Sequence, residues 1–402
     1  MNILFLVNNT KISPNANGGA SVYFSHLELL HKAGFTVHLL FLDWNHDNTK
    51  AVISENINQD FVDEISEFYN SAAVLHVAYE VPKLSMNHLL NAVIHPEKFE
   101  YHFINAQNEV LLQNYCAQKQ IDLMWAEWRW SVLLAAYTSI DIPKIYAHHD
   151  WEYKLGKLRK QQKGLKYKFH LYQKKRVEMD VIQKVEACVS GSFTETEELK
   201  AFGATKSMYI PLTYSKTDIT ENDAKVPTIV HVGGMGTTAN RIGLERFLEV
   251  CWETIKQQIP HVKLNVIGSL KYASDSLQRR LEDPQINCLG FVKNLAPELK
   301  AYDIHIIPWE YNTGTRTRIP LVFNHAQVLV STKAAASCYP ELMHDENCIL
   351  SNDLQHMTTQ IIDLYNNAEK RIFTGDNARK TFLENFTTNT QIEKLKLFLN
   401  EI

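Results

Sequence analysis

Residues 2–42 read NILFLVNNTKISPNANGGASVYFSHLELLHKAGFTVHLLFL and contain two apolar runs separated by a glycine-containing loop and a helical pattern. The runs Asn2–Val7 and Val37–Leu42 have the length of buried strands, and Ala20–Lys32 carries apolar residues at helical spacing. A strand, a helix and a second strand in this order form a parallel βαβ unit with a right-handed crossover. The opening of the chain therefore predicts an α/β fold.

The same alternation continues along the chain and divides it into two halves. The polar stretch TYSKTDITENDAKV, residues 213–226, separates them, and Pro227 precedes a new apolar strand. We expect an N-terminal domain at residues 1–213, a linker at 214–226 and a C-terminal domain at 227–402. Further strands are expected at 73–77, 121–126, 144–148, 187–190, 229–232, 263–267, 304–308 and 328–331, with a helix at 244–256 and a helical tail at 377–402.

Two Rossmann-like domains of this kind face each other across a cleft, and the tail can pack on either of them. The 402 residues exceed the size at which a single core keeps growing, which also favours two domains.

The net charge of −4 argues against a nucleic-acid binder with a globally basic surface. The six cysteines are scattered without zinc-ligand spacing, and no signal peptide or apolar run of about 18 residues occurs. We therefore expect a cytoplasmic protein without a membrane span.

Two loops of the first half carry polar groups or glycines at strand ends, where ligands bind in parallel sheets. Gly18 and Gly19 allow close backbone approach, so the helix after them can offer N–H groups to an anion or a sugar, although a plain tight turn explains them equally well. The stretch YAHHDWEY, residues 146–153, follows a buried strand. It supplies four candidate site residues: His148, His149, Asp150 and Glu152.

Alternation of side chains along a strand predicts that only one of the two histidines faces the cleft. Metal binding or ordinary loop solvation is the alternative interpretation of this cluster.

The basic run KLGKLRKQQKGLKYKFHLYQKKR, residues 154–176, holds ten Lys and Arg and no acidic residue. Its interleaved apolar residues predict a helix that lies on anionic lipid headgroups, and a solvated helix face is the alternative.

Two loops of the second half have the residues that a phosphate needs. In VGGMGTTANRIGLERFLE, residues 232–249, Gly233 and Gly234 permit backbone approach and Arg241 adds positive charge, but no P-loop lysine follows. In IIPWEYNTGTRTRIPLVF, residues 306–323, a strand ends in a loop with two arginines. Candidate ligand-binding residues there are Glu310, Gly314, Thr315, Arg316 and Arg318. Two guanidinium groups suit a pyrophosphate, and an interdomain salt bridge is the alternative role for them.

With these segments in place, most of the chain resembles the family 4 glycosyltransferases, also called glycosyl transferases group 1, which have the GT-B fold. The stretches at 18–40, 147–153 and 189–212 are similar to that family's Gly-rich opening, its histidine loop near the donor sugar and its exit from the N-terminal domain. The most specific similarity is GTRTRIPLVFNHAQVLVST, residues 314–332, which resembles the family's donor-binding pattern. The resemblance gives the diphosphate role to Gly314, Thr315, Arg316 and Arg318.

The chain departs from the family at the two glutamate positions of this pattern. Thr313 and Leu321 stand where the family has two glutamates eight residues apart, the second of which holds the nucleotide ribose. A leucine cannot accept those hydrogen bonds. Glu310 could replace that carboxylate, the donor could be held differently, or the chain could be a non-catalytic relative.

The resemblance implies transfer of a hexose-type sugar from a UDP- or GDP-sugar to a glycan or lipid-linked glycan, with retention, in surface polysaccharide or glycoconjugate synthesis. It makes His149, Arg316 and Arg318 the catalytic residues, and we expect no metal and no cofactor because guanidinium groups can neutralise the diphosphate. A non-catalytic partner subunit and a nucleotide-sugar 2-epimerase are the alternatives. The expected location is cytoplasmic, with peripheral contact of residues 154–176 at the inner face of the membrane.

Overall fold

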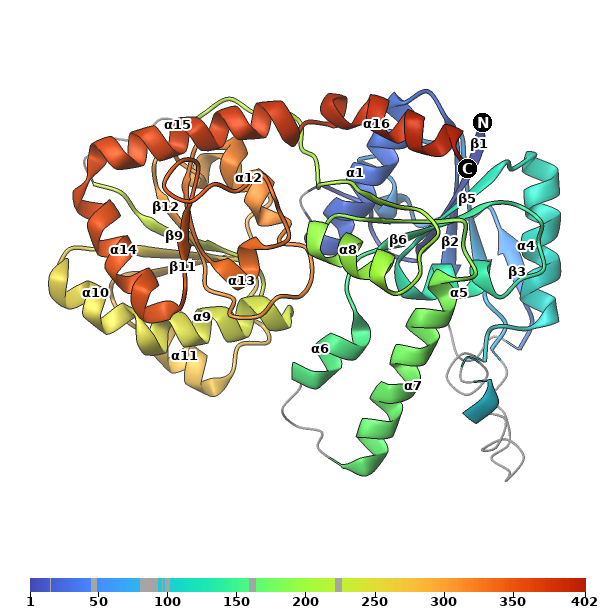
Figure 1. Ribbon diagram of the computed structural model, residues 1–402, viewed down its shortest axis with the longest axis horizontal. Coiled ribbons are helices and arrows are strands. Elements are labelled where there is room, and N and C mark those ends of the chain that lie inside the picture. The colour runs from blue at the N-terminus through green and yellow to red at the C-terminus, as the bar shows by residue number, and fades with distance from the viewer. Residues whose placement is uncertain are drawn as a thin grey trace.

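The computed structural model describes residues 1–14, 16–44, 49–79, 93–95, 97, 102–158, 164–220 and 226–402. Within these residues the chain forms two α/β domains, each built on one sheet, and they lie side by side along the long axis of the molecule (Figure 1). The expected architecture of two Rossmann-like domains is therefore confirmed. None of the described helices is long and apolar enough to cross a bilayer.

The N-terminal domain has an eight-stranded sheet in the order β3-β4-β2-β1-β5-β6-β7-β8. All neighbouring strands are parallel except β3 and β4. The central strands are buried on both faces, as expected for near-continuous apolar runs. The strands are β1 (Asn2–Asn8), β2 (Thr36–Asp43), β3 (Val52–Ser54), β4 (Ser71–His76), β5 (Leu123–Glu127), β6 (Lys144–His148), β7 (Ala187–Ser190) and β8 (Ser207–Tyr209).

Helices cover both faces of this sheet and form one hydrophobic core on each. Side chains of α1 (Gly18–Lys32) belong to one core, and those of the other N-terminal helices belong mainly to the second. The other helices are α4 (Ala106–Lys119), α5 (Trp128–Ala136), α6 (Glu152–Leu158), α7 (Leu165–Ile182) and α8 (Phe193–Ala201), with a 3-10 turn at Gln59–Phe61. The pair α6 and α7 projects from the body of the domain (Figure 1).

The C-terminal domain has a six-stranded, all-parallel sheet in the order β11-β10-β9-β12-β13-β14. The expected helix at 244–256 is divided into two helices at Cys251, which stays in the right-handed helical region and whose thiol donates to the carbonyl of Leu354. The strands are β9 (Ile229–Val232), β10 (Leu264–Ile267), β11 (Ile286–Gly290), β12 (Ile304–Ile307), β13 (Val328–Thr332) and β14 (Ile349–Ser351). The helices are α9 (Thr238–Val250), α10 (Trp252–Gln258), α11 (Asp275–Leu281), α12 (Arg318–Asn324), α13 (Lys333–Ala336), α14 (Leu354–Asn366) and α15 (Ala368–Asn385), with a 3-10 turn at Ala296–Glu298.

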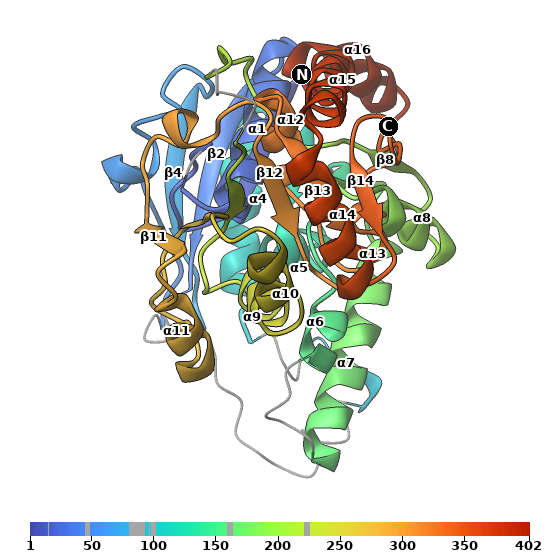
Figure 2. The ribbon, with the colours of Figure 1, turned by 90° about the vertical axis from the view of Figure 1, so that its left-hand side faces the viewer.

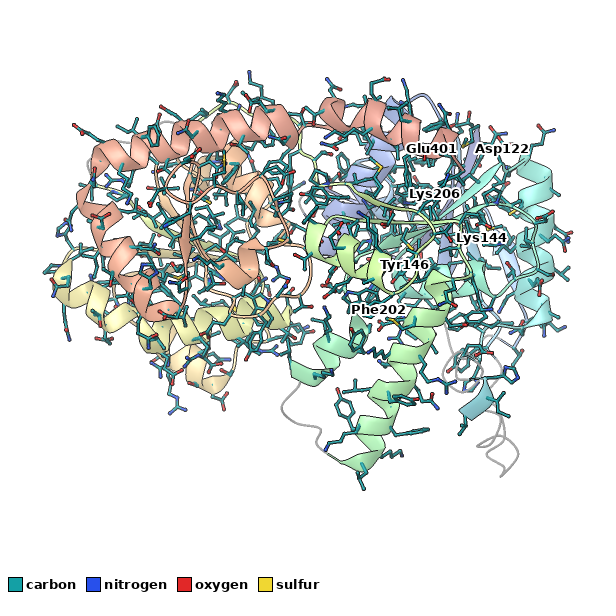
Figure 3. All side chains as sticks on the ribbon, viewed as in Figure 1. Asp122, Lys144, Tyr146, Phe202, Lys206 and Glu401 are labelled. Carbon is teal, nitrogen blue, oxygen red and sulfur yellow. The ribbon has the colours of Figure 1, made fainter. Side chains whose placement is uncertain are left out.

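The end of the chain returns to the N-terminal domain. Helix α16 (Thr388–Asn400) packs on α1, and its residues Leu395 and Leu399 are part of an N-terminal core (Figure 2). The carboxylate of Glu401 lies 3.8 Å from Nζ of Lys206, which precedes β8 (Figure 3). Two passages of the chain therefore connect the domains: one after β8, and one between α15 and α16.

Candidate functional site

A cavity of about 530 Å³ lies between the two domains, at the carboxyl ends of their strands. Its N-terminal wall is formed by the loop from β1 into α1 and by the residues that follow β6. Its C-terminal wall is formed by the loops after β9, β10, β11 and β12. Parallel sheets bind their ligands at this edge, because the loops there can vary without disturbing the sheet.

The loop between β1 and α1 brings backbone rather than side chains to the cavity. The side chain of Asn17 caps α1 by accepting from the N–H of Ala20 at 3.0 Å. Gly18 and Gly19 line the cavity, and a Cβ on Gly18 would lie 3.3 Å from Oγ1 of Thr317 in the opposite domain. Glycine therefore permits a close approach of the two domains at this point.

His148 and His149 both contribute to the wall of the cavity, but the side chain of His148 is fully buried, whereas that of His149 is 9% exposed. The strand β6 ends at His148. His148 is buried, with Nδ1 3.0 Å from the hydroxyl of Tyr146 and Nε2 3.3 Å from a carboxylate oxygen of Glu195. His149 has its Nε2 2.6 Å from Oε2 of Glu127. His149 is therefore hydrogen-bonded to a carboxylate, whereas Nε2 of His148 lies near Glu195 without a hydrogen bond to it.

Asp150 lines the cavity, whereas Glu152 does not. Burial and the nearby charge of Glu195 raise the pKa of Asp150 to about 7, although Arg316 acts in the opposite direction. Glu152 instead lies 3.3 Å from Arg129 and 3.5 Å from Lys174 within the N-terminal domain. The structure therefore separates Glu152 from the other residues of its loop.

The loop after β12 places Thr315, Arg316 and Arg318 in the wall of the cavity. Gly314 has φ of +73° and donates its N–H to Oε1 of Glu195 at 2.9 Å, so the loop is tied to the N-terminal domain. A Cβ on Gly314 would lie 2.1 Å from Oδ1 of Asp150. Only glycine fits this backbone conformation without a clash.

Arg316 and Arg318 are held by neutral groups. Arg316 donates to the carbonyl of Thr313 at 2.8 Å, and Arg318 donates to Oδ1 of Asn240 at 2.8 Å and to the carbonyl of Val232. Burial and the charge of Arg316 lower the pKa of Arg318 to about 9. In the part of the chain that the structure describes, neither arginine forms an ion pair with a carboxylate, so the interdomain salt bridge considered for them does not form.

Gly233 and Gly234 line the cavity after β9. The backbone of Gly268, which follows β10, packs directly on them, since a Cβ there would lie 2.6 Å from the carbonyl carbon of Gly233. Arg241 is not among the lining residues and donates to the carbonyl of Met235 at 3.2 Å. Arg241 is thus held by the backbone of its own loop, beside the cavity lining.

Glu310 also lies outside the cavity. Its Oε2 is 3.3 Å from Nε of Arg246, in a separate pocket next to α9. Leu321 does line the cavity and packs beside Val292 and Leu295. Glu310 therefore does not replace the missing carboxylate, and this part of the wall is apolar.

Several cavity residues escape the sequence motifs. On the C-terminal side these include Ser269, Tyr272 and Phe291, which lie in loops without recognisable signals. On the N-terminal side, Glu127 and Glu195 lie behind the cavity wall, where Glu127 is hydrogen-bonded to His149 and Glu195 lies 3.3 Å from His148. Glu127 directly follows the strand expected at 121–126, so the rule that ligands bind at the carboxyl ends of strands could have identified it.

Residues 226–367 match the family described as Glycosyl transferases group 1. No curated protein sequence matches the chain. Among solved structures, sucrose-phosphate synthase from Thermosynechococcus elongatus superposes with a TM-score of 0.70 and 13% identity, over 100% of this chain and 98% of that one. Anabaena HepE in complex with UDP and glucose gives a TM-score of 0.67 and 14% identity, over 100% and 99% of the two chains. A Staphylococcus aureus TarM mutant in complex with fondaparinux, alpha-GlcNAc-glycerol and UDP gives 0.65 and 13%, over 99% of both chains.

Proposed function

We propose that the chain is a glycosyltransferase and that it uses a UDP- or GDP-sugar as donor, because it has the GT-B fold and residues 226–367 match the Glycosyl transferases group 1 family. The acceptor is a glycan or a lipid-linked glycan, and the anomeric configuration is retained. The reaction belongs to surface polysaccharide or glycoconjugate synthesis. HepE has been solved with UDP and glucose, and TarM with UDP and a glycan, which supports donor and acceptor classes of this kind.

The observation that carries this proposal is the pair Arg316 and Arg318. Both line the cavity, both lack a carboxylate partner among the described residues, and the glycine backbone of the loop after β9 lies in the same wall. Arg316 is buried and Arg318 is partly buried, and a bound diphosphate would supply negative charge that no ion pair in the described part of the chain provides. These charges also make a metal ion unnecessary for binding the diphosphate.

The same residues have roles in the transfer step. The acceptor oxygen bonds to the anomeric carbon as the bond from that carbon to the diphosphate breaks, and the acceptor proton passes to the released diphosphate. Negative charge grows on the diphosphate, so Arg316 and Arg318 stabilise the transition state more than the ground state. His149 contacts the donor sugar, and Gly18 and Gly19 shape the N-terminal side of the site.

The exposed apolar residues of α7 support a membrane-bound acceptor. Leu165, Phe169 and Tyr172 are 85%, 46% and 59% exposed, and Lys166 and Lys168 lie among them. A helix with exposed apolar side chains and lysines binds anionic lipid surfaces in two ways. Its apolar side chains are buried in the bilayer interface, and its positive charges are attracted to the headgroups. Residues 159–163, which complete the basic run, lie outside the described part of the chain. We propose that α7 docks the enzyme on the cytoplasmic face of the membrane.

The test is an assay of nucleoside diphosphate release from UDP-, GDP- and dTDP-sugars, with and without lipid extracts as acceptor. We expect acceptor-dependent release from one donor, and loss of that release by a factor of at least about 100 in Arg316→Ala, as for other charge-stabilising donors. Conversion of the donor without an acceptor would indicate an epimerase. Full activity of Arg316→Ala would contradict the proposed role of this residue.

A further inference from the structure

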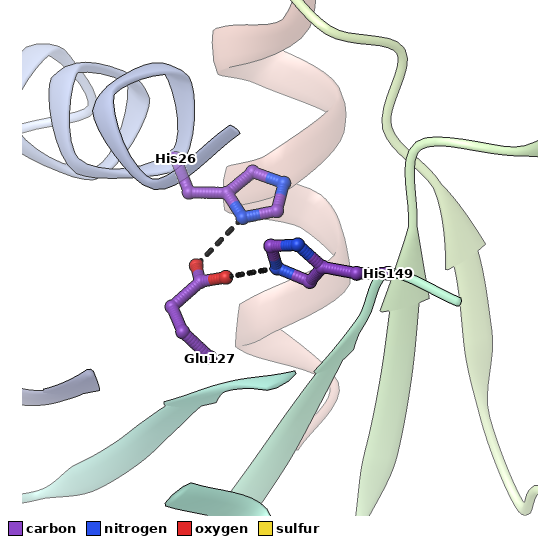
Figure 4. Close-up of side chains that lie close together, drawn as sticks. All are labelled: His26, Glu127 and His149. Atoms are coloured by element: carbon purple, nitrogen blue, oxygen red, sulfur yellow. Dashed lines mark hydrogen bonds and ion pairs between the residues drawn. The ribbon is translucent and has the colours of Figure 1, made fainter. Parts of the chain in front are cut away.

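Glu127 forms the centre of a buried hydrogen-bond network under the cavity wall. Its Oε2 lies 2.6 Å from Nε2 of His149, and its Oε1 lies 2.7 Å from Nδ1 of His26 (Figure 4). The indole N–H of Trp125 donates to the same Oε1 at 2.7 Å. Burial opposes ionisation of Glu127, but the two histidines outweigh burial and lower its pKa to about 2. Glu127 is therefore a carboxylate, and it can only accept hydrogen bonds.

This arrangement fixes the tautomer of His149. Because Glu127 only accepts, Nε2 of His149 must carry the hydrogen. Burial lowers the pKa of His149 despite the carboxylate beside it, which favours the neutral ring. A neutral ring with its hydrogen on Nε2 has a free electron pair on Nδ1. In Figure 4, Nδ1 lies on the side of the ring away from Glu127, and it makes no hydrogen bond to another described residue.

The backbone next to Glu127 is also unusual. Trp128 follows it with φ of +62°, a left-handed conformation that is rare for a bulky residue. The strand β5 ends at Glu127 and α5 begins at Trp128, so the chain turns from strand to helix without a connecting residue. Such conformations gather at functional sites, where the surrounding structure holds them in place.

We propose that Glu127 is a positioning residue that makes His149 a hydrogen-bond acceptor, through Nδ1, for a hydroxyl group of the sugar in the cavity. The inference rests on the proposed function in one respect, namely that a sugar occupies the cavity. His149 then selects for a hydroxyl that can donate at that position, and a sugar with no hydroxyl there loses the contact. His26 holds the second side of the Glu127 carboxylate and keeps it oriented.

The same three side chains could be considered as ligands of a metal ion, since their ligating atoms lie within 4.8 Å of one another. Ligands of a tetrahedral zinc ion at about 2.0–2.1 Å from the metal are about 3.3 Å apart. The separations of 2.6 and 2.7 Å are shorter than this and match direct hydrogen bonds. The geometry thus favours a hydrogen-bond network.

The first test is 15N NMR of the histidine side chains in the full-length protein, with the His149 signals assigned by their loss in His149→Asn. For His149 in the wild type at pH 7, we expect a protonated Nε2 and an unprotonated Nδ1. In Glu127→Gln the side-chain amide can donate, so we expect the proton of His149 to be shared between Nε2 and Nδ1. A proton on Nδ1 in the wild type would overturn the proposal. A stoichiometric bound zinc ion would overturn it as well.

The second test is kinetic and uses the active donor. In Glu127→Gln we expect kcat to fall at least tenfold, while calorimetry with UDP and GDP gives unchanged affinity and so shows that the fold is intact. The acid limb of the pH profile should move to lower pH, because loss of the carboxylate lowers the pKa of His149. Glu127→Asp should recover part of kcat.

The matched control is Asp43→Asn, which removes the carboxylate 2.8 Å from His76, a pair outside the cavity. We expect no change in kcat or in the pH profile from this substitution. An unmoved acid limb in Glu127→Gln would contradict the positioning role. If the NMR result holds but no sugar donor is turned over, the proposed function fails and the tautomer assignment remains.

Discussion

At the scale of single residues, Gly314 joins the two walls of the cavity. Its N–H is bound by Glu195, its φ is +73°, and a Cβ would lie 2.1 Å from Asp150 and 2.6 Å from Nη2 of Arg316. No other residue of the loop combines a positive φ with so little space. The position of Arg316 therefore depends on this glycine.

We predict that Gly314→Ala weakens nucleoside diphosphate binding at least tenfold and lowers the free energy of unfolding by about 1–3 kcal/mol, because it adds backbone strain and a clash. Calorimetry with UDP and GDP and urea unfolding measure the two effects. Gly34→Ala is the control, since Gly34 has φ of +88° but open space around its Cβ. Equal binding by wild type and Gly314→Ala would contradict this prediction.

The residues of the site divide into those that sequence can predict and those that it cannot. Arg316 and Arg318 lie two positions apart in one loop, so a local pattern is enough to bring them to the same wall. The contact of Glu127 with His26 joins residues 101 positions apart, and only the folded sheet shows it. Arg241 and Glu310 lie outside the cavity lining, because charge and nearness in sequence do not decide which way a side chain turns.

At the scale of secondary structure, the apolar runs predicted the central strands well because those strands are buried on both faces. The short strands β3 and β8, and the exposed β11, gave no comparable signal. The helix expected at 244–256 keeps its apolar periodicity across Cys251, so the break between α9 and α10 could not be read from spacing alone.

We predict that helix α7 binds the protein to anionic lipid bilayers. We expect the wild-type protein to float with vesicles that contain phosphatidylglycerol and to remain in solution with pure phosphatidylcholine. Leu165→Glu combined with Phe169→Glu should abolish flotation, because it removes apolar area and adds negative charge. Leu397→Glu on α16, where Leu397 is 67% exposed, is the matched control and should float normally. Equal flotation with both lipids would contradict electrostatic docking of α7.

At the scale of the whole molecule, the end of the chain completes a core near its beginning. Leu395 of α16 is fully buried among residues of α1 and the first sheet. The sequence left the partner of this tail open, because an amphipathic helix pattern does not name the surface it covers. The structure shows that the first domain includes residues from both ends of the chain.

We predict that Leu395→Ala lowers the free energy of unfolding of the N-terminal domain by about 2–5 kcal/mol, the cost of a cavity in a packed core. Hydrogen exchange should show faster exchange in α1 and little change in the C-terminal sheet. Leu397→Ala, which removes an exposed side chain from the same helix, should have almost no effect. Faster exchange in the C-terminal sheet alone would mean that α16 belongs to the other domain.

The central claim is that the two arginines of the cavity bind the diphosphate of a nucleotide-sugar, and calorimetric titration with UDP, GDP and dTDP tests it most directly. We predict that one of the three binds, that Arg316→Ala weakens this binding at least tenfold, and that Arg246→Ala leaves it unchanged because Arg246 lies outside the cavity and pairs with Glu249 and Glu310. If none of the nucleotides binds, or if Arg316→Ala binds as tightly as the wild type, the proposed donor site is wrong.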